Sequence, residues 1–297
     1  MSEIITEYLN ENTKDIDIIS TVEMIKKIND EDKLVAYAVE SEIEHIAQAV
    51  DLIAESFNNG GNLIYFGCGT SGRLGILDAS ECPPTFSTNP EMVQGIIAGG
   101  KDAFTRAVEG AEDDFEQGVE DAKILAPEDI CVVISASGNP KYLLGVLKTA
   151  DEIGAKTIAI TCNSESKIGE EVRVCICAEV GPEVIAGSSR LKAGTAQKMI
   201  LNMLSTGSMI KIGKTYKNLM IDLRATNDKL KDRAIRIVSQ IAETTHAKAF
   251  AVLEKSDWDI KIAVASILLN LDIDEAKKEL KKHGGVLRKL LKSGEKI

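Results

Sequence analysis

The chain has 297 residues, of which 44% are hydrophobic, and a formal net charge of −11 at pH 7. This composition indicates an ordinary globular protein with one large or two modest domains. The acidic excess argues against a general surface for nucleic acid or for an anionic membrane. No apolar run is long enough to cross a membrane and no signal-peptide pattern opens the chain, so we expect a cytoplasmic protein.

The first 60 residues predict an arm followed by two helices. Residues 1–19 are polar and mixed, which is typical of an arm. Ser20, with Glu23 three residues later, predicts a helix start, because each side chain can cap the other's backbone N–H group. A second helix is expected over 43–57 and ends at the turn 58–61. Both helices should pack on a sheet or on a second subunit.

A strand, a glycine-rich turn and a helix follow between Asn62 and Phe86. Four apolar residues, 63–66, predict a buried parallel strand, and a helical pattern starts near Gly72 and stops at Pro83-Pro84. Backbone N–H groups converge at such a turn and the helix dipole favours negative charge, so the turn is a candidate phosphate site. Its predicted phosphate-binding residues are Gly69, Thr70, Ser71 and Gly72.

Taken alone, this turn is a weak motif. Residues 67–72 fit G-x-G-x-x-G but lack the Walker A pattern, and the two hydroxyl groups favour a bare phosphate. A tight strand-to-helix turn without a ligand is the alternative. Glu81 lies near the end of the helix and supplies an acid–base group, with an ordinary surface glutamate as its alternative.

The middle of the chain alternates strands and helices. This alternation predicts an α/β fold, with a doubly wound parallel five-stranded sheet covered on both faces and ligands at the carboxyl ends of the strands. The turn after the third strand contains Ser135, Ser137 and Gly138, which are expected to share one phosphate with the first turn. Its alternative is a helix N-cap, and both can hold. Further strands are expected over 93–98, 130–134, 157–161 and 172–178, and helices over 102–122, 141–152 and from 188 or 189 to about 212.

The pattern changes beyond Lys214, where short amphipathic helices predict a small helical domain. These helices are expected over 226–239, 246–254, 258–270 and 273–282.

Six cysteines are scattered without a paired C-x-x-C pattern, so free thiols in a reducing compartment are favoured over metal binding. Three histidines lie away from the glycine turns, which leaves acid–base work to carboxylates. No metal and no cofactor are predicted.

Five segments of the chain together carry a family signature: 69–86, 94–100, 106–114, 181–198 and 218–234. They resemble the N-acetylmuramic acid 6-phosphate etherase family, which has a sugar isomerase-type (SIS), flavodoxin-like fold. The resemblance implies N-terminal elements over 1–54, a SIS sugar-phosphate domain over 55–218 and a helical domain over 219–297, similar to ubiquitin-associated domains. A packing or dimer role for that domain is favoured over ubiquitin binding.

The resemblance also implies an activity. The D-lactyl ether of N-acetylmuramic acid 6-phosphate is cleaved to N-acetylglucosamine 6-phosphate and D-lactate, by elimination and then hydration. Glu81 and Glu112 match the family's catalytic positions. We assign Glu81 as the acid that protonates lactate, and Glu112 as its partner for the water or the C2 proton. Judged locally, Glu112 belongs to an acidic cluster that looks like a solvated helix start.

Three further residues receive weaker predictions. Glu183 is expected to contact sugar hydroxyls, with a helix-start carboxylate as its alternative. Lys192 and Arg190 are candidates for the phosphate or the lactyl carboxylate, or for pairs with surface acids. The chain departs from the family pattern at residues 139–141, Asn-Pro-Lys, which puts phosphate contacts there in doubt, and at Ser87, where the family usually has glycine.

Two rival functions remain open on the same fold. One is a sugar-phosphate isomerase, which would release no lactate. The other is a non-catalytic sugar-phosphate sensor resembling glucokinase regulatory protein, which would not need an acid at Glu81. A homodimer is expected, because SIS proteins often build their sites between subunits.

Overall fold

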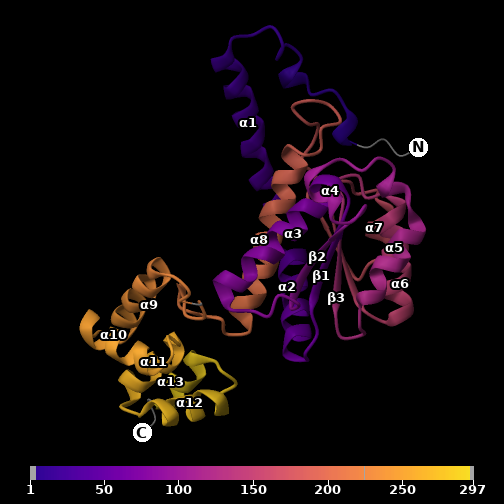
Figure 1. Ribbon diagram of the computed structural model, residues 1–297. Coiled ribbons are helices and arrows are strands. Elements are labelled where there is room, and N and C mark those ends of the chain that lie inside the picture. Colours follow the sequence, from indigo (N-terminus) through magenta and orange to yellow (C-terminus); the bar gives the residue numbers. More distant parts are fainter. Residues whose placement is uncertain (1–4, 224, 295–297) are drawn as a thin grey trace. The chain divides into compact units, whose positions relative to one another are not determined.

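The computed structural model describes residues 5–223 and 225–294 (Figure 1). Contacts divide the chain into two compact units. Unit 1 comprises Met1–Ser80 and Pro90–Gly207, and unit 2 comprises Glu81–Asn89 and Ser208–Ile297. Within the described ranges, no helix combines the length and the apolar character needed to cross a bilayer.

Unit 1 is built on a five-stranded sheet whose strands are all parallel and follow the order β2-β1-β3-β4-β5. This order confirms the predicted doubly wound, flavodoxin-like fold, and it places the topological switch point between β1 and β3. The strands are β1 (Leu63–Gly67), β2 (Val93–Ile97), β3 (Ile130–Ile134), β4 (Lys156–Thr161) and β5 (Val174–Cys177).

Helices cover both faces of the sheet, because successive side chains of each buried strand point to opposite sides. On one face, Ile64 and Val133 pack in a core with Leu143 of α6 (Lys141–Ile153). On the other, Gly75 of α3 (Gly69–Phe86) lies against the Tyr65 side chain. Figure 1 shows α2, α3 and α8 on one side of the strands and α5, α6 and α7 on the other. The remaining bounds are α2 (Ile43–Asn58), α5 (Phe115–Asp121), α7 (Lys167–Glu170) and α8 (Lys192–Lys211).

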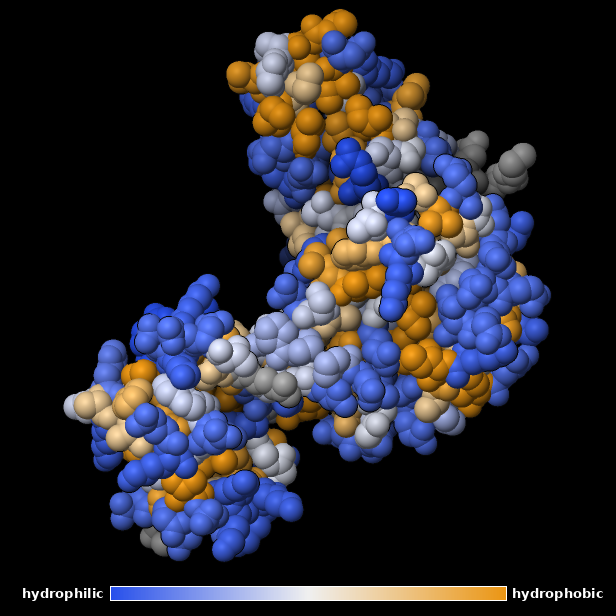
Figure 2. All heavy atoms as spheres, viewed as in Figure 1, coloured by the Kyte–Doolittle hydropathy of each residue, from blue (hydrophilic) through white to orange (hydrophobic). Residues whose placement is uncertain are grey.

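The arm contains two 3-10 turns, η1 (Ile5–Glu7) and η2 (Glu11–Thr13), and is attached to unit 1. The Thr13 hydroxyl donates to the Val184 carbonyl at 2.9 Å. The helix α1 (Thr21–Glu40) follows, and the predicted capping box of Ser20 and Glu23 is confirmed. The first half of α1 buries no side chain, and Figure 2 shows hydrophobic residues gathered on this helix.

The predicted continuous helix over 102–122 is wrong. The segment contains α4 (Asp102–Thr105), a 3-10 turn η3 (Ala111–Asp113), α5 and a 3-10 turn η4 (Ala122–Ile124). The chain leaves the helical conformation at Arg106, which is extended, and Gly110 adopts a left-handed φ of 74°. The helical pattern in the sequence therefore continues across a break that begins at the extended Arg106 and includes the left-handed Gly110.

Two helix boundaries also differ from the predictions. The helix α3 starts at Gly69 and passes Pro83-Pro84 to end at Phe86, and Ser87 after it has a φ of 50°. This left-handed conformation explains why a glycine suits that position. The helix α8 starts at Lys192 instead of residue 188 or 189.

Unit 2 is helical with its own hydrophobic core, which includes Val238, Leu253, Val264 and Leu280. The four predicted helices are present, whereas the two-stranded hairpin and the last helix were not predicted. The elements are β6 (Thr215–Tyr216), β7 (Leu219–Met220), α9 (Asp228–Ile241), α10 (His246–Lys255), α11 (Ile260–Leu269), α12 (Ile273–Lys282) and α13 (Leu287–Gly294).

Candidate active site

The first predicted phosphate turn joins β1 to α3 at the carboxyl edge of the sheet. Gly69 opens the helix with a φ of 52°, and a Cβ atom on Gly72 would lie 2.6 Å from the Gly67 carbonyl oxygen. The turn is therefore closed so tightly that a side chain at Gly72 is excluded. The first amide groups of α3, from Gly69 and Thr70, have no intrahelical acceptor and are suited to an anion.

Ser71 is held from α8. Its buried hydroxyl lies 3.0 Å from the side-chain oxygen of Gln197, and the buried Gln197 Nε2 has no hydrogen-bond partner among the described residues. If the Gln197 side-chain amide were rotated by about 180°, its Nε2 would donate a hydrogen bond to Ser71 Oγ. The Ser71 hydroxyl would then be able to donate its own hydrogen bond to a ligand. Gln197 was not predicted, because it lies 126 positions from Ser71 and no local pattern links the two residues.

The second predicted turn follows β3. Ser135 Oγ accepts the Gly138 N–H at 3.0 Å and therefore closes its own turn instead of capping α6, whose N-cap is Pro140. Ser137 is half-buried, and its carbonyl accepts from Asn163 at 3.0 Å. Both predicted turns thus end adjacent strands at the switch point. Their phosphate contacts stay a prediction.

A third turn, after β4, contributes a residue that was not predicted. Ser166 is 1% exposed and its hydroxyl has no partner among the described residues. A Cβ atom on Gly138 would lie only 2.1 Å from the Ser166 Cβ. The absence of a side chain at Gly138 therefore allows Ser166 to pack against the second turn. The substituted segment 139–141 places Lys141 Nζ 3.6 Å from an Asp113 oxygen.

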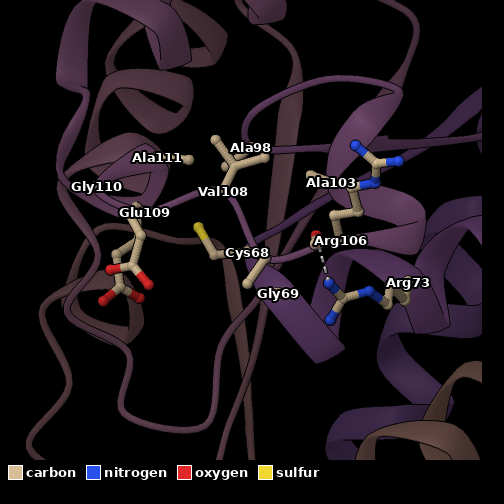
Figure 3. A pocket seen from close by; sticks show the side chains of 12 residues that line it. Cys68, Gly69, Arg73, Ala98, Ala103, Arg106, Val108, Glu109, Gly110 and Ala111 are labelled. Atoms are coloured by element: carbon tan, nitrogen blue, oxygen red, sulfur yellow. Dashed lines mark hydrogen bonds between the residues drawn. The ribbon is translucent and has the colours of Figure 1, made fainter.

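A cavity of about 230 Å³ opens beside the first turn, between the ends of β1 and β2 (Figure 3). It contains two guanidinium groups and two carboxylates, all on partly or fully exposed residues. One of the two carboxylates belongs to Glu112 on η3, so this predicted catalytic residue and Gly69 line the same cavity. The lining that matters for chemistry is Cys68, Gly69, Arg73, Arg106, Glu109 and Glu112.

Cys68 lies at the centre of this lining in Figure 3. Burial, together with the charge of Glu112, raises the pKa of the Cys68 thiol to about 12. The thiol is therefore protonated near neutral pH and is a poor nucleophile, which leaves proton transfer in the cavity to carboxylates. All six cysteines are free, and no group of three or more His, Cys, Asp or Glu suited to a metal occurs within 5–223 and 225–294.

Glu81 is exposed on α3, twelve residues beyond Gly69. An α-helix rises about 1.5 Å per residue, so these two positions are about 18 Å apart along the helix axis. A single sugar phosphate held at Gly69 does not span that length. The catalytic role of Glu81 stays a prediction.

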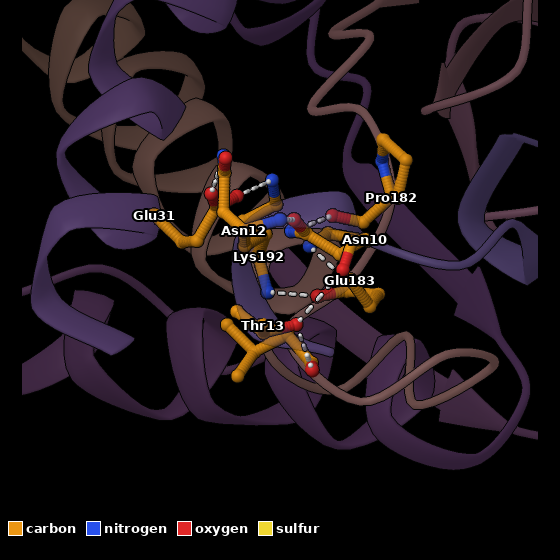
Figure 4. Close-up of polar contacts among 9 residues, drawn as sticks. Asn10, Asn12, Thr13, Glu31, Pro182, Glu183 and Lys192 are labelled. Atoms are coloured by element: carbon orange, nitrogen blue, oxygen red, sulfur yellow. Dashed lines mark hydrogen bonds and ion pairs between the residues drawn. The ribbon is translucent and has the colours of Figure 1, made fainter. Parts of the chain in front are cut away.

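Glu183 and Lys192 lie in a buried cluster that joins the arm to α8 (Figure 4). The Lys192 ammonium contacts the Glu31 carboxylate of α1 at 2.7 Å, and Asn12 donates to the other Glu31 oxygen at 2.8 Å. The Glu183 carboxylate accepts the backbone N–H groups of Lys192 at 2.8 Å and Ala193 at 3.0 Å. Glu183 thus caps α8, which explains why that helix starts at Lys192.

Burial opposes the negative charge of both carboxylates of this cluster, but their pKa values shift in opposite directions. Burial raises the pKa of Glu183 above its ordinary value, despite the two backbone donors. For Glu31, burial also opposes the charge, but hydrogen bonds from Lys192 and Asn12 outweigh it and hold its pKa below the ordinary value. The charged groups of Lys192 and Glu183 are therefore engaged within the protein, and their predicted substrate contacts stay predictions, as does that of the exposed Arg190.

Family models match three stretches of the chain. The N-terminal SIS domain of glucokinase regulatory protein matches residues 45–151, the SIS domain matches 107–207, and the C-terminal lid domain of glucokinase regulatory protein matches 217–276.

Named relatives match over nearly the whole chain. The N-acetylmuramic acid 6-phosphate etherase of Vibrio atlanticus is 50% identical over 297 residues, covering 99% of this chain and 97% of that protein. The chain belongs to the N-acetylmuramic acid 6-phosphate etherase family. The etherase of Clostridium beijerinckii is 52% identical over 293 residues, with 98% and 96% covered. The family resemblance predicted from the five segments is thus confirmed.

Solved structures of two phosphoheptose isomerases share the fold of this etherase-family chain. The Francisella tularensis enzyme has a TM-score of 0.51 at 19% identity and covers 65% of this chain and 100% of its own. The Neisseria gonorrhoeae enzyme has a TM-score of 0.50 at 19% identity, with 64% and 98% covered. At such low identity the likeness shows the SIS fold alone.

Proposed function

We propose that the protein cleaves the D-lactyl ether of N-acetylmuramic acid 6-phosphate to N-acetylglucosamine 6-phosphate and D-lactate. Membership of the etherase family over nearly the full chain supports this reaction. The single structural observation that supports it best is the cavity that brings Glu112 beside the glycine–hydroxyl turn. A proton-transferring carboxylate next to a phosphate site is what an elimination on a sugar phosphate needs.

The phosphate would occupy the cup formed by the two turns. Its donors would be the amides that open α3 and the hydroxyls of Thr70, Ser71, Ser135 and Ser137. In the open-chain sugar, the aldehyde at C1 acidifies the C2 proton. Removal of that proton and cleavage of the C3–O bond give a C2–C3 double bond, and the departing oxygen takes up a proton. Water then adds at C3.

Glu112 is proposed as the carboxylate that handles the C2 proton or the water, because it lines the cavity beside Gly69. Glu81 is proposed as the acid that protonates lactate. Since α3 rises about 18 Å between Gly69 and Glu81, we propose that each Glu81 serves the cavity of a second copy of the chain. The proposed assembly is a homodimer, and the apolar residues exposed on α1, among them Val22 and Ile25, are suited to a subunit contact.

The reaction is tested by measuring D-lactate release from the substrate in heavy-oxygen water by the wild type and by Glu81→Gln. Lactate from the wild type, its loss in the variant and label at C3 of the sugar are expected. A folded wild type that binds the sugar phosphate without releasing lactate would favour the isomerase or sensor instead.

The shared site is tested by mixing two inactive variants, Glu81→Gln and Glu112→Gln, under conditions that exchange subunits. If Glu81 acts in the partner's cavity, a mixed dimer contains one cavity with both wild-type glutamates, and activity returns. If both glutamates act within one chain, every cavity keeps one defect and the mixture stays inactive. Each variant mixed with itself is the control.

A further inference from the structure

Arg73 and Arg106 both line the cavity. Among the described residues, only the Arg73 guanidinium of these two hydrogen-bonds to other groups of the protein. Arg73, on α3, donates from Nε to the Phe104 carbonyl and from Nη2 to the Arg106 carbonyl, each at 3.0 Å. These carbonyls belong to the last turn of α4 and to its C-cap residue, so Arg73 fixes the end of α4 to α3. Its guanidinium therefore holds the wall of the cavity in place.

Arg106 is the second arginine that lines the cavity. Its backbone is extended, with φ −131° and ψ 158°, and it caps the end of α4. Within residues 5–223 and 225–294, the Arg106 guanidinium has no hydrogen bond and no ion pair. Figure 3 shows Arg73 and Arg106 on one side of the cavity and Glu109 on the other, with Cys68 between them. Arg73 anchors the Arg106 backbone, and the exposed Arg106 guanidinium, which has no partner among the described residues, is available to an anionic ligand.

We propose that Arg106 binds the carboxylate of the substrate's D-lactyl group, an inference that rests on the proposed function. The substrate carries two anions. The phosphate has a cup of hydroxyl and amide donors at the switch point, which leaves the carboxylate to a second donor set. A guanidinium is planar and presents two parallel N–H groups, which match a carboxylate in a bidentate pair. Phosphate-only sugars lack this second anion, so Arg106 determines specificity for the lactyl ether.

The position of the carboxylate gives this contact a role in bond cleavage. The lactyl carbon that carries the carboxylate also carries the ether oxygen, so a guanidinium paired with the former lies near the latter. When the C3–O bond breaks, its electron pair goes to that oxygen, which then takes a proton from the acid. The positive charge of Arg106 stabilises the developing negative charge and transfers no proton itself.

The test compares Arg106→Met and Arg106→Lys with the wild type in two assays. The first is kcat/KM for D-lactate release from N-acetylmuramic acid 6-phosphate. The second is the inhibition constant of N-acetylglucosamine 6-phosphate, which has the phosphate but no carboxylate. We expect the methionine variant to lose about 10- to 100-fold in kcat/KM, as for a lost charge-assisted hydrogen bond. Its inhibition constant should change less than about threefold, and lysine should restore part of the loss.

Arg173→Met is the matched control, because Arg173 is an exposed arginine next to the amino end of β5 and the substitution changes the charge equally. Thermal unfolding of all variants reports folding. A parallel weakening of the inhibitor would assign Arg106 to the phosphate and overturn the inference, as would an unchanged kcat/KM. If the wild type releases no lactate, the proposed function fails and the inference fails with it, which is a different result from active enzyme with an indifferent Arg106.

Discussion

Two groups of charged residues in unit 1 have similar chemistry and opposite surroundings. The arm cluster, formed by Glu31, Glu183 and Lys192, is buried, and Lys192 is only 1% exposed. Its carboxylates and its ammonium all have hydrogen-bond partners at 2.7 to 3.0 Å. The open cavity contains two arginines and two glutamates that stay accessible, and Arg106 has no partner among the described residues.

Burial, more than residue type, therefore separates charged groups that hold the structure together from charged groups that can bind a ligand. A buried charge must be paired and fully hydrogen-bonded, so the arm cluster fixes the arm, α1 and α8 in one arrangement. An accessible charge costs little to leave unpaired, so the cavity can keep its groups for a ligand. The two regions are joined by α8, which carries Lys192 at its start and Gln197, the contact of Ser71, one turn later.

The largest effect on stability is expected from Lys192→Met. The substitution leaves the buried Glu31 without its cation and should lower the free energy of unfolding by about 3–5 kcal/mol. Denaturant unfolding measures it. Lys198→Met is the control, because Lys198 lies on the same helix but is half-buried and hydrogen-bonds to the exposed Asn202 side chain. If both variants lost the same free energy of unfolding, the distinction between buried and accessible charge would be contradicted.

An intermediate, pH-dependent effect is expected from Glu31→Gln. At pH 7 the loss should be about 1.5–3 kcal/mol, as for a hydrogen bond to a charged group. The folded pKa of Glu31 lies below its ordinary value of 4.5, so its stabilisation is present above that pH and is lost as the pH falls through the folded pKa. The gap between wild type and variant should therefore shrink below about pH 4.5. A gap that stays constant down to acid unfolding contradicts this account.

The smallest effect on stability is expected in the open cavity, from Glu109→Gln. Glu109 is exposed, so water replaces any interaction that its charge makes, and the unfolding midpoint should not move. Its lactate release should stay within about tenfold of wild type, whereas Glu112→Gln should lose about 100-fold or more as a proton-transferring group. The reverse order of activities would transfer the catalytic role to Glu109.

Local patterns predicted the sheet well, because a buried strand, a glycine turn and a helix start are each encoded within a few neighbouring residues. The strands β1 and β3 and the capping box of α1 lie where the sequence placed them. The break between α4 and α5 was missed, since apolar spacing continues across it while Gly110 turns the backbone. The hairpin β6–β7 was missed because two-residue strands are too short to show a period.

The candidate site likewise has features that the sequence predicts and features that depend on the folded structure. The family, the fold and the two glycine–hydroxyl turns could be predicted from the sequence, because these depend on residue order and on short motifs, while phosphate binding by the turns stays a prediction. The pairing of Lys192 with Glu31, 161 positions away, and the contact of Gln197 with Ser71 depend on the folded structure and could not be predicted from the sequence. The folded structure also shows that the Arg73 guanidinium is hydrogen-bonded within the protein, whereas the Arg106 guanidinium has no partner among the described residues. A side chain's partners and its exposure depend on which distant segments fold against it, and spacing along the chain does not encode them.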